Sequence, residues 1–363
     1  MATIASFLSQ LARRTRPDRA AGWDPVGLQL GDPARDVERV AVCHEVTEGA
    51  VDRILDARPQ LVVTYHPLLF RPTRSLVAGR SPAGRAFRLL EAGIGLAVTH
   101  TDFDGAPGGT ADALADELGL EDISPFGPLE ASEQAKIVTF APEGAVDGLV
   151  EAMSRAGAGR IGNYEACSFR TLGTGSFAAG EGADPVVGRA GEMNLEQEMR
   201  VEVLAPTARR EAVIAALVGA HPYEEPAFDV YEVHSNHGLI GRAGSWRGTL
   251  ADLVTRVEAR LDPAGLRVAG DLAGSPGRVA VVPGSGSSFL TAARQAGAEA
   301  LVTGDVDHHR ASAALDGGVA IVDPGHAATE LAGMRRLVDI VAAMGVEVDP
   351  LIGDGDGPWT RRG

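Results

Sequence analysis

The sequence predicts an α/β fold: an outer α/β domain with mainly parallel sheets, interrupted by an inserted ferredoxin-like domain of β-α-β-β-α-β order. Two observations predict it. At both ends of the chain, short apolar strands alternate with single helices, which is typical of parallel strands joined by crossovers. In the middle, two helices are set among paired strands. The expected boundaries are 1–128 and 241–363 for the outer domain and 129–240 for the insert.

Between residues 1 and 128, the alternation is regular. The N-terminal IASFLSQLARRTRPD predicts a short helix, and in EGAVDRILDAR the residues Val51, Ile54 and Leu55 share one helical face. Each strand is an apolar run closed by polar residues, as expected where helices cover both faces of a sheet. Strands are predicted at 37–46, 59–67 and 94–104, and further helices at 48–58, 81–93 and 108–120.

The middle and last segments follow two different orders. The middle predicts strands at 133–142, 164–177, 198–206 and 227–233, with helices at 146–158 and 208–221 and a Gly-rich hairpin tip at 177–188. The last segment returns to the first pattern, with helices at 245–261, 287–298, 309–318 and 327–343 and strands at 277–286, 299–309 and 319–326. We therefore expect the first and last segments to form one domain.

Composition narrows the class of protein. With 363 residues, 45% of them hydrophobic, the chain can form two or three globular domains. A formal net charge of −16 argues against DNA as a partner. No apolar run is long enough to span a membrane and no secretory leader is recognisable, so we expect a cytoplasmic protein. The only cysteines, Cys43 and Cys167, exclude a disulfide framework and a thiolate zinc cluster.

The segment VDPGHAATE, residues 322–330, is the most informative motif. It ends a short apolar strand and places His326 and Glu330 four residues apart at the start of a helix. This spacing puts both side chains on one helical face, where they can bind one or two divalent metal ions. Taken alone, the pair is explained more simply by an ordinary helix with a terminal histidine and a solvated glutamate.

Further polar residues close other predicted strands. The full set is His66, His100, Asp104, Asp305, His308, His309, His326 and Glu330. Because the carboxyl ends of parallel strands meet at one edge of a sheet, we expect these side chains to converge. Imidazole and carboxylate ligands without thiolate suit zinc, iron or manganese. Together the strand ends predict a metal site.

These motifs resemble a known family, the type 2 GTP cyclohydrolase I homologues, also called Nif-three-like dinuclear-metal proteins. The outer-domain matches are WDPVGLQLGD (23–32), TYHPLLF (64–70), VTHTDFD (98–104), PGSGSS (283–288), LVTGDVDHHRA (301–311) and VDPGHAATE (322–330). The insert matches through GAGRIGNYEACSFRTLGTGSF (157–177) and HPYEEPAFDVY (221–231) and resembles a PII-like copper-tolerance domain. The resemblance covers nearly the whole chain.

The resemblance implies a two-metal site. Carried over by position, its ligands are His66, His100, Asp104, His326 and Glu330, with Glu330 as the bridging ligand. The family has a histidine where this chain has Tyr65, and a neutral phenol is a poor ligand unless its pKa of about 10 is lowered. The implied cofactor is therefore one or two divalent ions of zinc, iron or manganese.

Two functions follow as hypotheses. The first is a metal-dependent hydrolase of a small, nucleotide-like substrate, with Asp305, Glu45 and His309 as candidates for proton transfer. The second is a metal-binding chaperone or sensor, or a regulatory assembly, without robust turnover. For both, the resemblance implies a homohexameric ring whose partners are its own copies. The lack of a long apolar run predicts no membrane as a partner.

The remaining motifs have two readings each. The glycines of PGSGSS either cradle a phosphate at a helix N-terminus or form a tight strand-to-helix turn. The HPYEEP segment, with Glu224 and Glu225, suggests a metal site, but a helix-to-strand turn is the simpler explanation.

Overall fold

The computed structural model describes residues 2–129, 134–161, 164–178, 180, 186, 188–189, 191–233 and 238–352. The chain forms two compact units. The first unit combines Met1–Leu129 with His237–Gly363, and the second is Glu130–Asn236. In the part of the chain that is described, no helix is long and apolar enough to cross a membrane.

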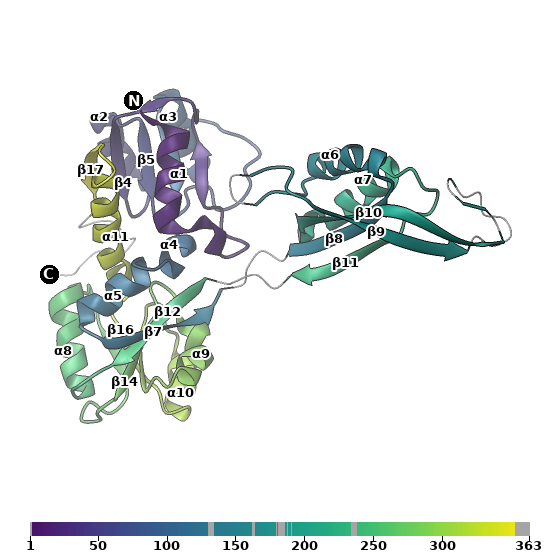
Figure 1. Cartoon of the computed structure of the whole chain (residues 1–363). Coiled ribbons are helices and arrows are strands. Elements are labelled where there is room, and N and C mark those ends of the chain that lie inside the picture. The colour runs from purple at the N-terminus through teal and green to yellow at the C-terminus, as the bar shows by residue number, and fades with distance from the viewer. Residues whose placement is uncertain are drawn as a thin grey trace. The chain divides into compact units, whose positions relative to one another are not determined.

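In the first unit, the sheet that contains β17 (Glu347–Leu351), β4 (Arg39–Cys43) and β5 (Leu61–Thr64) (Figure 1) has five strands. Their order is β17, β4, β5, β6 (Gly95–Val98) and β2 (Gly27–Leu30). The first four are parallel, and β2 pairs antiparallel with β6 at the edge. Helices α1 (Ile4–Thr15) and α11 (His326–Ala342) bury one face, and α2 (Glu48–Ala57) and α3 (Pro82–Glu91) bury the other. This double cover explains why β4 and β5 are almost wholly apolar.

The other sheet of the first unit has six strands. Their order is β13 (Arg267–Ala269), β16 (Ala320–Asp323), β15 (Ala300–Val302), β14 (Arg278–Val281), β12 (Leu239–Ser245) and β7 (Glu121–Pro128). Strands β14, β15 and β16 are parallel, whereas β7, β12 and β13 join by antiparallel pairs. Helices α5 (Thr110–Leu118) and α8 (Leu250–Leu261) bury one face, and α9 (Leu290–Gln295) and α10 (His308–Asp316) the other. Both large sheets are therefore mixed: the five-stranded sheet is antiparallel only at β2, whereas the six-stranded sheet is parallel only across β14, β15 and β16.

Local signals set several helix ends. Thr249 and Asp252 form a reciprocal capping box at the start of α8. A further short sheet pairs β1 (Ala2–Thr3) with β3 (Asp36–Val37). The expected strand at 94–104 is too long, because β6 ends at Val98 and a short helix α4 (Thr101–Gly105) follows. The Asp102 carboxylate accepts the His100 N–H at 2.6 Å, which turns the chain into this helix.

The second unit has the element order β8 (Gln134–Ala141), α6 (Val146–Arg155), β9 (Phe169–Ala178), β10 (Met193–Pro206), α7 (Arg210–Ala220) and β11 (Phe228–Val233). Its sheet has the order β11-β8-β10-β9, and all its pairs are antiparallel. Ile137, Val201 and Val203 face the two helices and form the core with Leu149 and Leu217. Most of the expected Gly-rich hairpin tip at 177–188 lies outside the described residues.

Candidate metal centre

The candidate site lies in the first unit, at the carboxyl ends of parallel strands from both sheets. Strands β4, β5 and β6 lead into one group of residues, and β14, β15 and β16 lead into another. In chain order these residues are His44, Tyr65, His66, His100, Gly284, Asp305 and His326. Each strand end is held in place by its parallel neighbours, so the sheets position side chains that lie far apart in the sequence.

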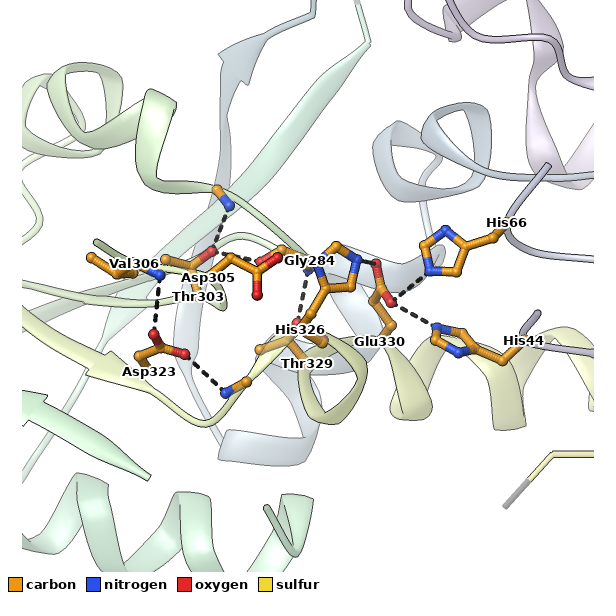
Figure 2. Close-up of polar contacts among 12 residues, drawn as sticks. His44, His66, Gly284, Thr303, Asp305, Val306, Asp323, His326, Thr329 and Glu330 are labelled. Carbon is orange, nitrogen blue, oxygen red and sulfur yellow. Dashed lines mark hydrogen bonds and ion pairs between the residues drawn. The ribbon is translucent and has the colours of Figure 1, made fainter. Parts of the chain in front are cut away.

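The centre of the site is the Glu330 carboxylate on α11, which contacts three histidines (Figure 2). Glu330 Oε2 lies 2.7 Å from His44 Nε2 and 3.3 Å from His66 Nε2. Its other oxygen, Oε1, lies 3.1 Å from Nε2 of His326, one helical turn earlier. Glu330 is only 2% exposed, so the carboxylate depends on these contacts rather than on water. Its two oxygens thus contact histidines that follow strands of different sheets.

The histidines determine the charge of this carboxylate. Burial favours the neutral acid, but hydrogen bonds to His326, His44 and His66 outweigh burial and hold the pKa of Glu330 well below its ordinary value. Burial opposes the charged form of His326, yet contacts with Glu330 and Asp305 raise its pKa to about 9. Burial is the main cause that lowers the pKa of His66. The site therefore contains an ionised carboxylate, with at least one neutral imidazole beside it.

Tyr65 lies beside the cluster and is fully buried. Its hydroxyl donates a short hydrogen bond to Asp104 Oδ1. Burial, and then the nearby Asp104 and Glu330 carboxylates, raise the pKa of Tyr65 well above its ordinary value, so the phenol keeps its proton. Burial also raises the pKa of Asp104, to about 6. In this arrangement Tyr65 is a hydrogen-bond donor to Asp104 rather than a phenolate.

His100 connects Tyr65 to the histidine cluster. Its ring centroid lies 5.3 Å from that of Tyr65 and 5.3 Å from that of His66. Both oxygens of Asp24 lie 3.1 Å from His100 Nδ1, and one also accepts the Thr101 N–H at 3.0 Å. Because Nδ1 is used in this contact, Nε2 is the nitrogen through which His100 can bind an ion.

The second sheet supports His326 in a similar way. Asp305 Oδ2 lies 2.7 Å from His326 Nδ1, and Asp305 adopts a left-handed conformation with φ of 57° (Figure 2). The Thr329 hydroxyl accepts the Gly284 N–H at 2.8 Å and donates to the His326 carbonyl at 2.6 Å. At Gly284, where φ is 62°, a Cβ would lie 2.7 Å from Glu330 Oε1. Glycine is thus needed here for both backbone conformation and space.

The donor set fits a divalent metal ion. One ligand atom from each of His44, His66 and Glu330 lies within 4.8 Å of the others. Two imidazoles and a carboxylate, with no thiolate, suit zinc, iron or manganese. The space at Gly284, which a single Cβ would fill, lies against the same carboxylate.

The structure brings most of the predicted residues together. His66, His326 and Glu330 are in direct contact, and His100 and Asp104 border them through ring and hydrogen-bond contacts. Asp305 touches His326, whereas His309 is exposed in the first turn of α10 beside His308. Glu45 is partly buried next to His44 in the chain, and no polar contact of its side chain with the cluster is found among the described residues.

Sequence reasoning missed His44 and Asp24. His44 follows β4 just as His66 follows β5, so the rule that selected His66 and His100 could have found it. Asp24 gave no comparable signal, because it lies 76 residues before His100 in an irregular turn. The structure therefore adds one candidate ligand and one residue that orients a ligand.

Comparison with known proteins gives a consistent match. The model of the Duf34/NIF3 (NGG1p interacting factor 3) family matches residues 2–351. A Mycobacterium bovis protein named GTP cyclohydrolase 1 type 2 homolog is 36% identical over 98% of this chain and 96% of its own length. A Halalkalibacterium halodurans protein of the same name is 35% identical over 87% of each chain. A solved Bacillus cereus structure, described as a protein related to NIF3, has a TM-score of 0.64 and 32% identity over 99% of both chains.

Proposed function

The chain belongs to the Duf34/NIF3 family, and from this premise we propose that it is a metal-dependent hydrolase acting on a small, nucleotide-like substrate. One observation carries the proposal: the Glu330 carboxylate is the common partner of three imidazoles that come from separate strand ends. Two imidazoles and a carboxylate within 4.8 Å of one another form a donor set that a divalent cation can bind.

In this proposal the residues have different roles. His44, His66 and Glu330 would hold one ion. His100, Asp104 and His326 would supply ligands for a second ion beside it, since His326 contacts Glu330 and His100 lies next to His66. Asp24 and Asp305 orient His100 and His326 through their Nδ1 atoms. When bound, a divalent ion lowers the pKa of a water molecule toward about 7 and polarises the bond to be attacked.

Proton transfer needs a group at the edge of the site. Asp305 is about half exposed and contacts His326, so it can exchange protons with solvent while touching a ligand. Glu45 and His309, the other candidates, have no such contact among the described residues. We therefore assign proton transfer to Asp305.

The experiment combines metal analysis with a substrate screen. Metal-loaded protein is tested for hydrolysis of nucleotides, including GTP, and of phosphoesters, with chelated protein and a Glu330→Gln variant in parallel. We expect turnover that requires both the ion and Glu330. Metal binding without turnover would instead support the alternative role of a metal-binding chaperone or sensor. Turnover unchanged by Glu330→Gln would sink the assignment of catalysis to this site.

We propose further that the second unit is a ferredoxin-like, PII-like insert and that the protein assembles as a homohexameric ring. Exposed apolar residues of the second unit support an assembly role, because isolated modules seldom expose so many. They include Phe169, Leu172, Met193 and Leu195. Light scattering should give a mass six times that of the 37.6-kDa chain, and a monomer would refute this proposal.

A further inference from the structure

Two large aromatic side chains are exposed beside the candidate metal centre. Trp23 is 55% exposed and Phe70 is 51% exposed, and their ring centroids are 5.9 Å apart. The Trp23 ring also meets His100 edge-on, with centroids 6.3 Å apart. An exposed aromatic pair is costly to leave in water, so its position next to candidate ligands points to a bound partner.

Polar contacts connect the two segments that carry this pair. The Gln29 side chain donates to Pro25 O at 3.2 Å and to Leu69 O at 3.0 Å, and it accepts the Leu69 N–H at 3.0 Å. Gln29 therefore links the turn that carries Trp23 to the segment that carries Phe70. Asp24, the neighbour of Trp23, is anchored on His100. Such preorganisation lowers the entropy that a ligand must overcome on binding.

The loop that follows Phe70 in the sequence carries positive charge, although the chain has a net charge of −16. The exposed loop 71–80 follows Phe70 directly and contains Arg71, Arg74 and Arg80 and no acidic residue. Arg80 approaches Glu48 at 4.0 Å, whereas Arg71 and Arg74 have no ion pair within the described part of the chain. Guanidinium groups of this kind suit phosphate oxygens.

We propose that the Trp23–Phe70 pair binds the planar base of a nucleotide and that Arg71 and Arg74 bind its phosphate. This inference rests on the proposed function, because it names the substrate class of the same site. An aromatic surface accepts a nucleobase by stacking, and the arginine loop gives the anionic end a separate contact. The base then lies beside His100, so the heterocycle is the part of the ligand closest to the candidate ligands.

Calorimetric titration of the metal-loaded protein tests this with guanosine, guanosine 5′-monophosphate and ribose 5-phosphate. Trp23→Leu and Phe70→Leu should each weaken guanosine about 10-fold, equivalent to about 1.4 kcal/mol. Trp23→Tyr should largely restore binding, because the aromatic face is kept. Phe228→Leu, at a 38% exposed aromatic of the second unit, is the matched control and should leave guanosine affinity unchanged. The double variant Arg71→Ala with Arg74→Ala should weaken the monophosphate about 10-fold and leave guanosine unchanged.

Two outcomes would overturn the inference: guanosine affinity unaffected by Trp23→Leu and Phe70→Leu, or ribose 5-phosphate bound as tightly as the monophosphate. Glu330→Gln separates this inference from the proposed hydrolase. That variant should lose metal and turnover while it still binds guanosine on Trp23 and Phe70. If Glu330→Gln loses turnover but still binds guanosine, the aromatic site is supported. If turnover requires the metal ion but is unaffected by Trp23→Leu and Phe70→Leu, the aromatic site is refuted while the proposed hydrolase stands.

Discussion

Histidines in the two units of this protein are bonded in contrasting ways. In the second unit, His221 accepts the Tyr223 N–H at Nδ1, at 3.1 Å, and its Nε2 lies 3.0 Å from the Phe140 carbonyl. Both nitrogens are thus used by nearby backbone. In the first unit, His44, His66 and His326 all approach one buried carboxylate. With both ring nitrogens bonded to backbone, His221 has no ring nitrogen left for a cation. A ring nitrogen that meets a carboxylate can instead share an ion with it, so the type of partner separates a structural histidine from a candidate ligand.

The largest effect should come from removing the charge of the shared partner. Glu330→Gln keeps the shape of the side chain but leaves three imidazoles around a neutral amide. We expect metal affinity to fall more than about 100-fold, beyond the 10–100-fold typical of residues that only orient a ligand. Metal content after dialysis, measured by mass spectrometry, checks this. Asp305→Asn is the matched control, with the smaller loss, since Asp305 touches only His326 Nδ1 among the histidines of the cluster.

A second test fills the space beside the carboxylate. Gly284→Ala places a Cβ 2.7 Å from Glu330 Oε1 and 3.2 Å from His326 Nε2, so both side chains must move. We expect weaker metal binding and a loss of about 1–2 kcal/mol of stability from the left-handed backbone alone. Gly345→Ala is the control, because Gly345 has a φ of 80° with no atom within 4 Å of its Cβ. It should reproduce the loss of stability in urea unfolding but keep full metal content; equal metal loss in both would contradict the steric explanation.

A third test concerns Tyr65, which stands where the resemblance implies a histidine ligand. Tyr65→His removes the phenol that donates to Asp104 and adds an imidazole beside His66 and His100. We expect the number of bound ions per chain to rise, because Asp104 is freed and a better ligand is gained. Tyr65→Phe separates the two causes, since it frees Asp104 without adding a ligand. Identical metal content in wild type and Tyr65→His would show that Tyr65 does not limit occupancy.

Much of this arrangement could be predicted from the sequence, because it depends on patterns of residues that are close together in the chain. Apolar runs closed by polar residues marked the ends of β5 and β6, and the spacing of His326 and Glu330 placed both on one helical face. Pairing across long distances was not predictable in the same way. Tyr65 and Asp104 are separated by 39 residues in the chain, and their hydrogen bond forms only because folding brings both to the same sheet edge.

Errors in the predicted elements also have physical causes. The strand expected at 94–104 ends early because the Asp102 side chain captures the His100 N–H. The expected strand at 299–309 likewise stops at Val302, and Asp307 caps the helix that begins at His308. At both places a short acidic side chain accepts a backbone N–H at the start of the following helix, a local signal that apolar patterning does not contain. Both places lie next to candidate site residues.

The smallest effect is expected from substituting His221, and it concerns the pH dependence of stability. Burial lowers the pKa of His221 below 6.5, so the folded state takes up its proton later than the unfolded chain as the pH falls. Its contribution to stability is therefore complete above pH 6.5 and declines as the pH drops toward the folded-state pKa. His221→Gln cannot titrate, so its unfolding midpoint in urea should fall less steeply between pH 7 and pH 5 than that of the wild type. Parallel pH profiles of the unfolding midpoint in the two proteins would contradict this. The metal content of the variant should stay unchanged, because both ring nitrogens of His221 are bonded to backbone in the second unit.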